Sequence, residues 1–123
     1  MTHRAFIFGV NTKGLKYCET DVQKMRACLS PHGYEITMPD PTGGKREINA
    51  KFDSWLDQIS QEDTLIVYFS GHGYLHRGNL VLVVGDDETR NSKYNVNLLT
   101  DGLADCTARH KLLILDCCHS GRG

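Results

Sequence analysis

The stretch LIVYFSGHG at residues 65–73 decides the fold, because a run of large apolar residues ends there in small and polar ones. A second stretch of the same design, LLILDCCHSG, occupies residues 112–121. Each run predicts a buried strand whose carboxyl end carries a reactive side chain, His72 in the first and Cys118 in the second. In open α/β sheets, sites form where the carboxyl ends of strands meet. A thiol beside an imidazole is the minimum equipment for nucleophilic acyl transfer, so the two motifs predict such a site.

Strand and helix signals alternate along the remainder of the chain. Thr20 and Gln23 form a capping-box pattern at the expected start of the first helix, and residues 85–97 are polar and predict a loop. Strands are expected at residues 5–10, 34–38, 64–70 and 80–84, with a hairpin entered near Tyr74, and helices at residues 20–29, 45–60 and 98–108. This alternation favours an α/β fold of βαβ units, with a mainly parallel sheet and helices on both faces.

Composition limits the classes of function. The 123 residues predict one domain, 1–123, and the 14 Lys and Arg against 15 Asp and Glu give a net charge of −1. That balance gives no electrostatic reason to expect nucleic acid or an anionic membrane as a partner. No apolar run approaches the roughly 18 residues of a membrane span, and the amino terminus does not read as a signal peptide. An odd number of cysteines favours free thiols and a cytoplasmic location: Cys18, Cys28, Cys106, Cys117 and Cys118.

Strand geometry decides which side chains of the two motifs can meet. Successive residues of a strand point to opposite faces, so Asp116 and Cys118 share one face while Cys117 faces the other way. Ser70 and His72 share a face for the same reason. If the two strands run side by side, one site collects these polar residues and leaves Cys117 as a buried neighbour.

Glycine residues accompany both reactive side chains. Gly71, Gly73 and Gly121 are expected to permit tight turns and the close approach of a substrate. The backbone N–H groups of Gly73 and Cys118 are candidate donors to the oxyanion that forms during acyl transfer. A free thiol is mostly protonated at neutral pH, so Cys118 needs a nearby base. The sequence therefore predicts a cysteine protease in which His72, upstream of the nucleophile, is the base.

The motifs also carry a family resemblance. SGHG at residues 70–73 and DCCHSG at residues 116–121 resemble the two signature motifs of the caspase-like cysteine peptidases. The resemblance is closest to the metacaspase and bacterial caspase-homologue branch, whose second motif reads Asp-x-Cys-His-Ser-Gly. His72 and Cys118 are 46 residues apart, which matches the spacing of about 50 known for caspases. FIFGVN at residues 6–11 and CETDV at 18–22 are similar to the family as well, so the resemblance covers essentially the whole chain.

The resemblance implies a caspase-hemoglobinase-like fold and a role for each matched residue. It implies His72 as the base, Cys118 as the nucleophile and Gly73 as a contributor to the oxyanion site. It also implies a specificity pocket, which in metacaspases holds a basic side chain, made of Cys18, Asp21, Ser70 and Asp116.

The acids of this pocket indicate the substrate. True caspases have glutamine where Asp116 stands here and take an aspartate, whereas two carboxylates favour a protein or peptide substrate with Arg or Lys before the scissile bond. Cys18 and Asp21 lie three residues apart at the start of a helix, so both can face one cleft. Asp21 also has a simpler interpretation, as a first-turn acid that the helix dipole favours.

The resemblance further implies a longer protein. In the family the fold continues past the cysteine, through a linker, into a small-subunit segment that completes the sheet and part of the substrate groove. We therefore expect residues 1–123 to be the N-terminal, large-subunit portion of the catalytic domain, needing that segment or a separate chain as a partner. Enzymes of this kind are zymogens, dormant until processing or a trigger activates them.

No metal or organic cofactor is needed for this chemistry. Adjacent cysteines, as at Cys117 and Cys118, lack the ligand spacing of zinc sites. The acidic residues 86–88 resemble those of calcium-responsive metacaspases, but residues 76–79 hold no acid, which favours a solvated loop and leaves calcium as the less favoured alternative. Two other functions remain open: a non-catalytic caspase-like module that binds partners as a scaffold, and a cysteine hydrolase of small amides.

Overall fold

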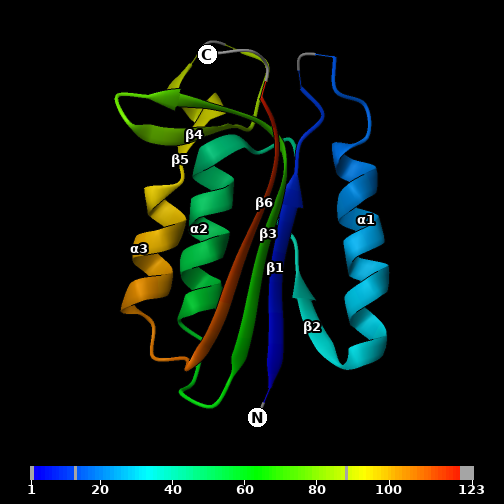
Figure 1. Ribbon diagram of the computed structural model, residues 1–123, viewed down its shortest axis with the longest axis vertical. Helices are drawn as coiled ribbons and strands as arrows, with labels where there is room; N and C mark the ends of the chain where they lie inside the picture. Colours follow the sequence, from blue (N-terminus) through cyan, green and yellow to red (C-terminus); the bar gives the residue numbers. More distant parts are fainter. Residues whose placement is uncertain (1, 13, 88, 120–123) are drawn as a thin grey trace.

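Four parallel strands form the centre of the molecule, in the order β2-β1-β3-β6 (Figure 1). The apolar sequences of the two inner strands, β1 and β3, account for their central position, since inner parallel strands are buried on both faces. The computed structural model describes residues 2–12, 14–87 and 89–119, with backbone alone for Cys118 and His119. The strands are β1 (His3–Gly9), β2 (Tyr34–Thr37), β3 (Thr64–His76) and β6 (His110–His119).

Strand β3 is longer than its parallel neighbours and continues into a hairpin. Beyond Gly73 it pairs in antiparallel fashion with β4 (Asn79–Val83), which pairs in turn with β5 (Lys93–Asn95). The hairpin turn consists of Arg77 and Gly78, both with positive φ, as a two-residue type I′ turn requires. The antiparallel arm of the hairpin begins at Gly73 and Tyr74, so the expectation that the hairpin is entered near Tyr74 is confirmed.

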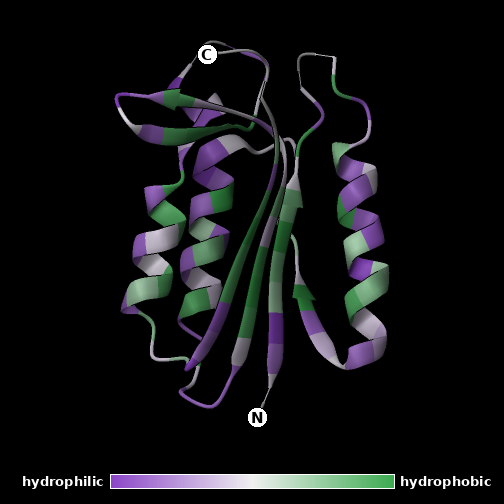
Figure 2. Cartoon of the chain, in the orientation of Figure 1, coloured by the Kyte–Doolittle hydropathy of each residue, from purple (hydrophilic) through white to green (hydrophobic). Residues whose placement is uncertain are grey.

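Helices cover both faces of the sheet. Figure 1 shows α1 (Cys18–Leu29) on one side and both α2 (Gly44–Leu56) and α3 (Asn97–Asp105) on the other, with apolar residues concentrated in the strands between them (Figure 2). Successive residues of each strand point to opposite faces of the sheet, so Ile7 packs toward α1 while Phe6 and Phe8 pack toward α2 and α3. Short 3₁₀ turns follow α1 and precede β5, at Ser30–His32 and Arg90–Ser92 (η2).

The predicted alternation of strands and helices is confirmed, with two local corrections. The first helix begins at Cys18 rather than at the capping box, and no side chain caps it. Instead, Asn11 Oδ1 accepts the N–H of Glu19 at 3.1 Å, and Glu19 Oε2 accepts the N–H of Asn11 at 3.4 Å. These two reciprocal hydrogen bonds across the loop satisfy the backbone at the start of the helix, as a capping box would. The polar segment expected to be a loop contains η2 and β5, whose Tyr94 is fully buried.

The expectation that Gly71 and Gly73 form tight turns is wrong. Both lie within β3, and neither has positive φ. Glycine is needed at both positions because neighbouring side chains leave no room for a Cβ. A Cβ at Gly71 would lie 2.7 Å from the ring of Phe69, and one at Gly73 would lie 3.1 Å from Cys117 Sγ. The strand therefore runs straight through the site. No helix in the described residues has the length and apolar character needed to cross a membrane.

Candidate active site

The two sequence motifs lie side by side at the carboxyl end of the parallel sheet. In the register of β3 and β6, Ser70 pairs with Asp116 and His72 pairs with Cys118. Residues opposite each other in neighbouring strands lie on the same face of a sheet. The expectation that these motifs form adjacent strands is therefore confirmed, and the backbone positions of His72 and Cys118 are direct neighbours.

His72 is buried, and its side chain makes no hydrogen bond to the residues that the structure describes. Its side chain is 8% exposed, and neither Nδ1 nor Nε2 has a partner in the described part of the chain. Buried polar groups are nearly always hydrogen-bonded, because an unpaired one costs about 1–3 kcal/mol. Within the described residues both ring nitrogens of His72 are left without a hydrogen bond, which is compatible with the prediction that His72 is the base.

The predictions for the nucleophile rest on backbone position alone. The side chains of Cys118 and His119 lie outside the described residues, as do residues 120–123 with Gly121. Gly73 is described. It pairs with His119 on one edge of β3 and with Leu82 on the other, so it marks the change from parallel to antiparallel pairing.

Hydrogen bonds connect the predicted pocket residues Ser70, Asp21 and Asp116 to one another or to a neighbour. Ser70 Oγ donates to Asp21 Oδ2 at 3.0 Å, which connects β3 to the first turn of α1. Asp116 Oδ2 accepts a hydrogen bond from the hydroxyl of Tyr68 at 3.3 Å. Cys18 is the first residue of α1 and is buried. These contacts bring the two carboxylates to the same face of β3 as His72.

Tyr68 is a site residue that sequence reasoning missed. Burial, followed by the negative charge of Asp116, raises the pKa of Tyr68 to about 12, and the charge of Asp21 contributes in the same direction. The phenol is therefore neutral at physiological pH and able to donate a hydrogen bond. The signal was present in the sequence, since Tyr68 precedes Ser70 by two residues and so shares its face. It was hidden because Tyr68 lies inside an apolar run and fits there as a core residue.

Close packing at Gly9 sets the position of α1. A Cβ there would lie 2.8 Å from the carbonyl oxygen of Ser70 and 2.9 Å from that of Cys18. Only glycine allows the end of β1 to lie this close to both β3 and α1. The contact explains why Asp21, one turn into α1, reaches Ser70.

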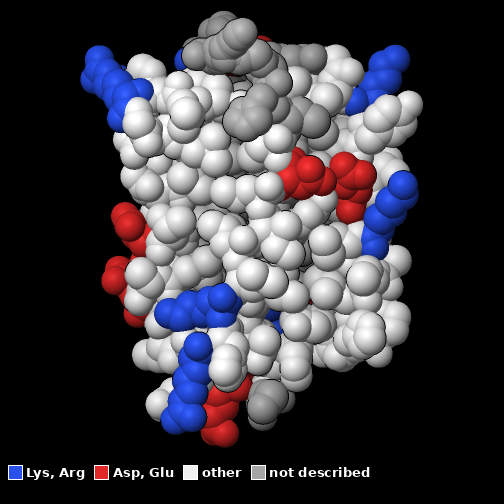
Figure 3. All heavy atoms as spheres, viewed as in Figure 1, with Lys and Arg blue, Asp and Glu red and all other residues white. Residues whose placement is uncertain are grey.

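Acidic groups gather at this end of the molecule. Figure 3 shows acidic atoms side by side over the upper ends of the sheet and of α1. Asp21 is half-buried and Asp116 is exposed. Neither carboxylate forms an ion pair in the part of the chain that the structure describes, where the ion pairs involve Arg4. Carboxylates on one face of a sheet are groups that pair with cations.

The other face of β6 has a structural role. Cys117 packs against the apolar core between the sheet and α2, with Leu113 and Leu115. The prediction that Cys117 faces away from Asp116 is confirmed. Within residues 2–12, 14–87 and 89–119, no cluster of three His, Cys, Asp or Glu side chains is arranged to hold a metal ion.

Comparison with known proteins agrees with this geometry. The protein family described as the caspase domain matches residues 2–123. No curated protein matches the sequence. The family match spans both motifs, both strands that carry them and the helix that supplies Asp21. The chain therefore belongs to the caspase domain family, a family of cysteine peptidases.

Proposed function

We propose that the chain is the large-subunit portion of a metacaspase-like endopeptidase that cleaves proteins after Arg or Lys. The observation that carries this proposal is the pair of hydrogen bonds from Ser70 to Asp21 and from Tyr68 to Asp116. Together they hold two carboxylates on the His72 face of the sheet. A guanidinium or ammonium group complements two carboxylates, whereas the aspartate that caspases take would be repelled.

The chemistry follows from His72 and Cys118. An imidazole nitrogen of His72 takes the thiol proton, and the thiolate sulfur attacks the carbonyl carbon of the scissile peptide. The oxyanion accepts a hydrogen bond from the Gly73 N–H. The C–N bond then breaks, and the proton held by His72 goes to the leaving amine. A water molecule next gives a proton to His72 and attacks the thioester, which releases the carboxylic acid and restores the thiol.

The pocket selects the residue before the scissile bond. Ser70 is 3% exposed and Tyr68 is 4% exposed, so both hydroxyls act from below the surface and fix the carboxylates rather than contact solvent. Fixed carboxylates lose less entropy when a substrate binds, and the planar guanidinium of arginine can bond each of them. We therefore expect arginine to be preferred over lysine.

A further strand at the free edge of β6 fits the same proposal. In the described residues β6 pairs with β3 alone, and Leu112 on this strand is 52% exposed. An unpaired strand edge with an exposed apolar side chain is a place where another strand can add. The small-subunit segment of the family would occupy this edge.

The cysteines bear on the location of the protein. The free thiols of Cys28 and Cys106 are consistent with a reducing compartment such as the cytoplasm.

The test is a set of fluorogenic peptides that differ only in the residue before the scissile bond: Arg, Lys, Gln or Asp. The 123-residue chain and a longer polypeptide that includes the following segment are assayed in parallel, each with a Cys118→Ala control. We expect release from the Arg peptide, less from Lys and none from Asp, all abolished by Cys118→Ala. Turnover of the Asp peptide alone would refute the specificity. Silence of both proteins, even after nicking and added calcium, would favour the non-catalytic scaffold.

A further inference from the structure

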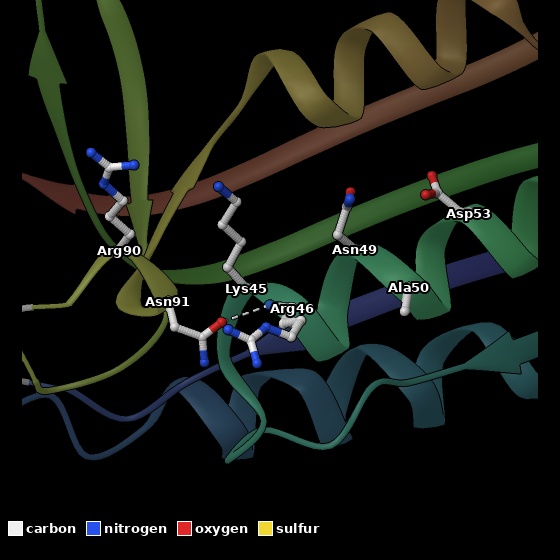
Figure 4. A pocket seen from close by; sticks show the side chains of 7 residues that line it. All are labelled: Lys45, Arg46, Asn49, Ala50, Asp53, Arg90 and Asn91. Carbon is white, nitrogen blue, oxygen red and sulfur yellow. Dashed lines mark hydrogen bonds between the residues drawn. The ribbon is translucent and has the colours of Figure 1, made fainter.

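A second charged region lies on the α2 side of the sheet, away from the predicted pocket. Two adjoining hollows of about 410 and 700 Å³ share Lys45 and Arg90 in their walls. Figure 4 shows the side chains of Lys45, from α2, and Arg90, from η2, extending toward the same space. The remaining polar and charged lining comes from α2, η2 and the β3–β4–β5 hairpin: Arg46, Asn49, Asp53, Tyr74, His76, Asn91, Lys93 and Asn95.

The fold holds the two basic segments together. Asn91 Oδ1 accepts the backbone N–H of Arg46 at 2.9 Å (Figure 4), and Asn91 Nδ2 donates to the carbonyl of Gly43 at 3.3 Å. Gly44 has a φ of +70°, and a Cβ there would lie 2.7 Å from the carbonyl oxygen of Asn91. Segments 45 residues apart in the sequence are therefore locked in contact, so the positions of Lys45 and Arg90 are fixed relative to each other.

Among the described residues, no acidic side chain forms an ion pair with the basic side chains of this region. Lys45, Arg46, Arg90 and Lys93 form no ion pair with any described residue. Lys45 and Arg46 also occupy the first turn of α2, where the positive end of the helix dipole disfavours a cation. Asp53, two turns further along α2, is the one acid among the described lining residues. Because the whole chain has a net charge of −1, this concentration of positive charge is local.

We propose that the two hollows form a binding site for a compact polyphosphate anion. Guanidinium and ammonium groups from three segments line these hollows together with amide donors, which is the chemistry that binds several phosphate oxygens at once. The volumes lie within the range of small-molecule sites. Most of the wall residues carry a charged or amide group, which favours a compact anion over an acidic peptide. Tyr74 and His76 follow His72 on β3, so the anion would join α2 to the strand that carries the predicted base.

The experiment measures binding of inorganic tripolyphosphate to the 123-residue chain by isothermal titration calorimetry at two salt concentrations, with ATP in a second arm. We expect saturable one-site binding that weakens with salt. Lys45→Gln/Arg90→Gln should weaken it at least tenfold, whereas Lys24→Gln/Arg26→Gln, on exposed positions of α1, should change it less than twofold. Tighter binding of ATP than of tripolyphosphate would identify a nucleotide as the source of the phosphates, and the reverse would identify a free polyphosphate.

Three results would overturn the proposal. They are no saturable binding of either anion, equal weakening in both double variants, and tighter binding of an acidic peptide of matched charge. Asp53→Asn adds an independent check, because removing the one acid from the described walls should tighten binding of tripolyphosphate. These outcomes do not depend on peptidase activity, so the site and the proposed cleavage reaction stand or fall separately.

Discussion

At the scale of single residues, the buried Tyr68 is expected to affect the proposed preference for Arg before the scissile bond, because it positions Asp116. Its hydroxyl donates to Asp116, and its neutral form is secured by the pKa of about 12. We expect Tyr68→Phe to raise KM for the Arg peptide about fivefold to tenfold with kcat little changed, since a hydrogen bond contributes roughly 1 kcal/mol. Steady-state kinetics with the Arg and Lys peptides measures this effect.

A second buried tyrosine provides the control for Tyr68. The hydroxyl of Tyr94 donates to Asn49 at 3.3 Å, and burial likewise raises its pKa. Tyr94 packs on the opposite side of the sheet, in the core that contains Phe8 and Phe52. Tyr94→Phe should therefore leave KM unchanged. A loss of kcat in Tyr68→Phe at constant KM would contradict the positioning role.

At the scale of secondary-structure elements, Gly9 determines where α1 lies against the sheet. Gly9→Ala would place a methyl group 2.8 Å from the Ser70 carbonyl oxygen, so β1, α1 or both must move. We expect a loss of about 1–3 kcal/mol in the free energy of unfolding, as is typical of overpacking, together with weaker binding of the Arg peptide because Asp21 moves with α1. Urea denaturation and KM are the measurements.

The matched control lies at the other end of the same helix. Gly33 follows α1 with a φ of +81°, and a Cβ there meets nothing within 4 Å. Gly33→Ala therefore adds backbone strain without a steric clash. It should lower stability and leave KM unchanged. If Gly9→Ala and Gly33→Ala affect KM equally, α1 does not transmit the position of Asp21.

The elements also show which features could be predicted from sequence. Strands β1, β3 and β6 and helix α2 were predictable, because the spacing of the apolar residues and the length of each apolar segment both indicate the same kind of element. The start of α1 was not, because Asn11 and Glu19 satisfy the helix end across a loop rather than through a local capping box. Strand β5 was missed for a similar reason. Its three residues, of which one is a buried tyrosine, are too few to show an alternation of apolar and polar residues, and the strand forms because it pairs with β4.

The candidate site was predictable as far as strand pairing decides it. Because side chains alternate between the two faces of a strand, the sequence predicted that Ser70 and His72 share a face and that Cys117 faces away from Asp116. The strand register and the packing of Cys117 in the core agree with this. The bond between Ser70 and Asp21 depends instead on the packing of α1, which no local pattern encodes. Gly71 and Gly73 were misinterpreted because glycine permits turns and close approach alike, and only the neighbouring side chains of Phe69 and Cys117 distinguish the two.

At the scale of the whole molecule, the two ends of the sheet have separate tasks. The predicted site lies at the carboxyl ends of the parallel strands, and an electrostatic anchor lies at the amino ends. There, buried Asp63 accepts hydrogen bonds from the N–H groups of Thr2 and Ser60 and from Arg4 Nε at 3.1 Å. Arg4 also forms an ion pair with Glu35 of β2 at 2.9 Å. This anchor connects β1, β2 and the start of β3.

The anchor makes stability depend on pH in a defined direction. The Ser60 N–H, followed by burial acting in the opposite direction and then Arg4, leaves the pKa of Asp63 below its usual range. A carboxyl whose pKa is lower in the folded state stabilises the fold above its unfolded pKa of about 3.9, and that contribution is lost as pH falls through the folded value. We expect Asp63→Asn to be about 2 kcal/mol less stable than the wild type at pH 7, and the difference to shrink in acid as the pH falls through the lowered pKa of Asp63. Urea denaturation at pH 7 and at a series of acidic pH values measures it, and a difference independent of pH would contradict the role of the charge. Because Asp63 lies at the opposite end of the sheet from His72, KM for the Arg peptide at pH 7 should be unchanged, so the two ends can be altered independently.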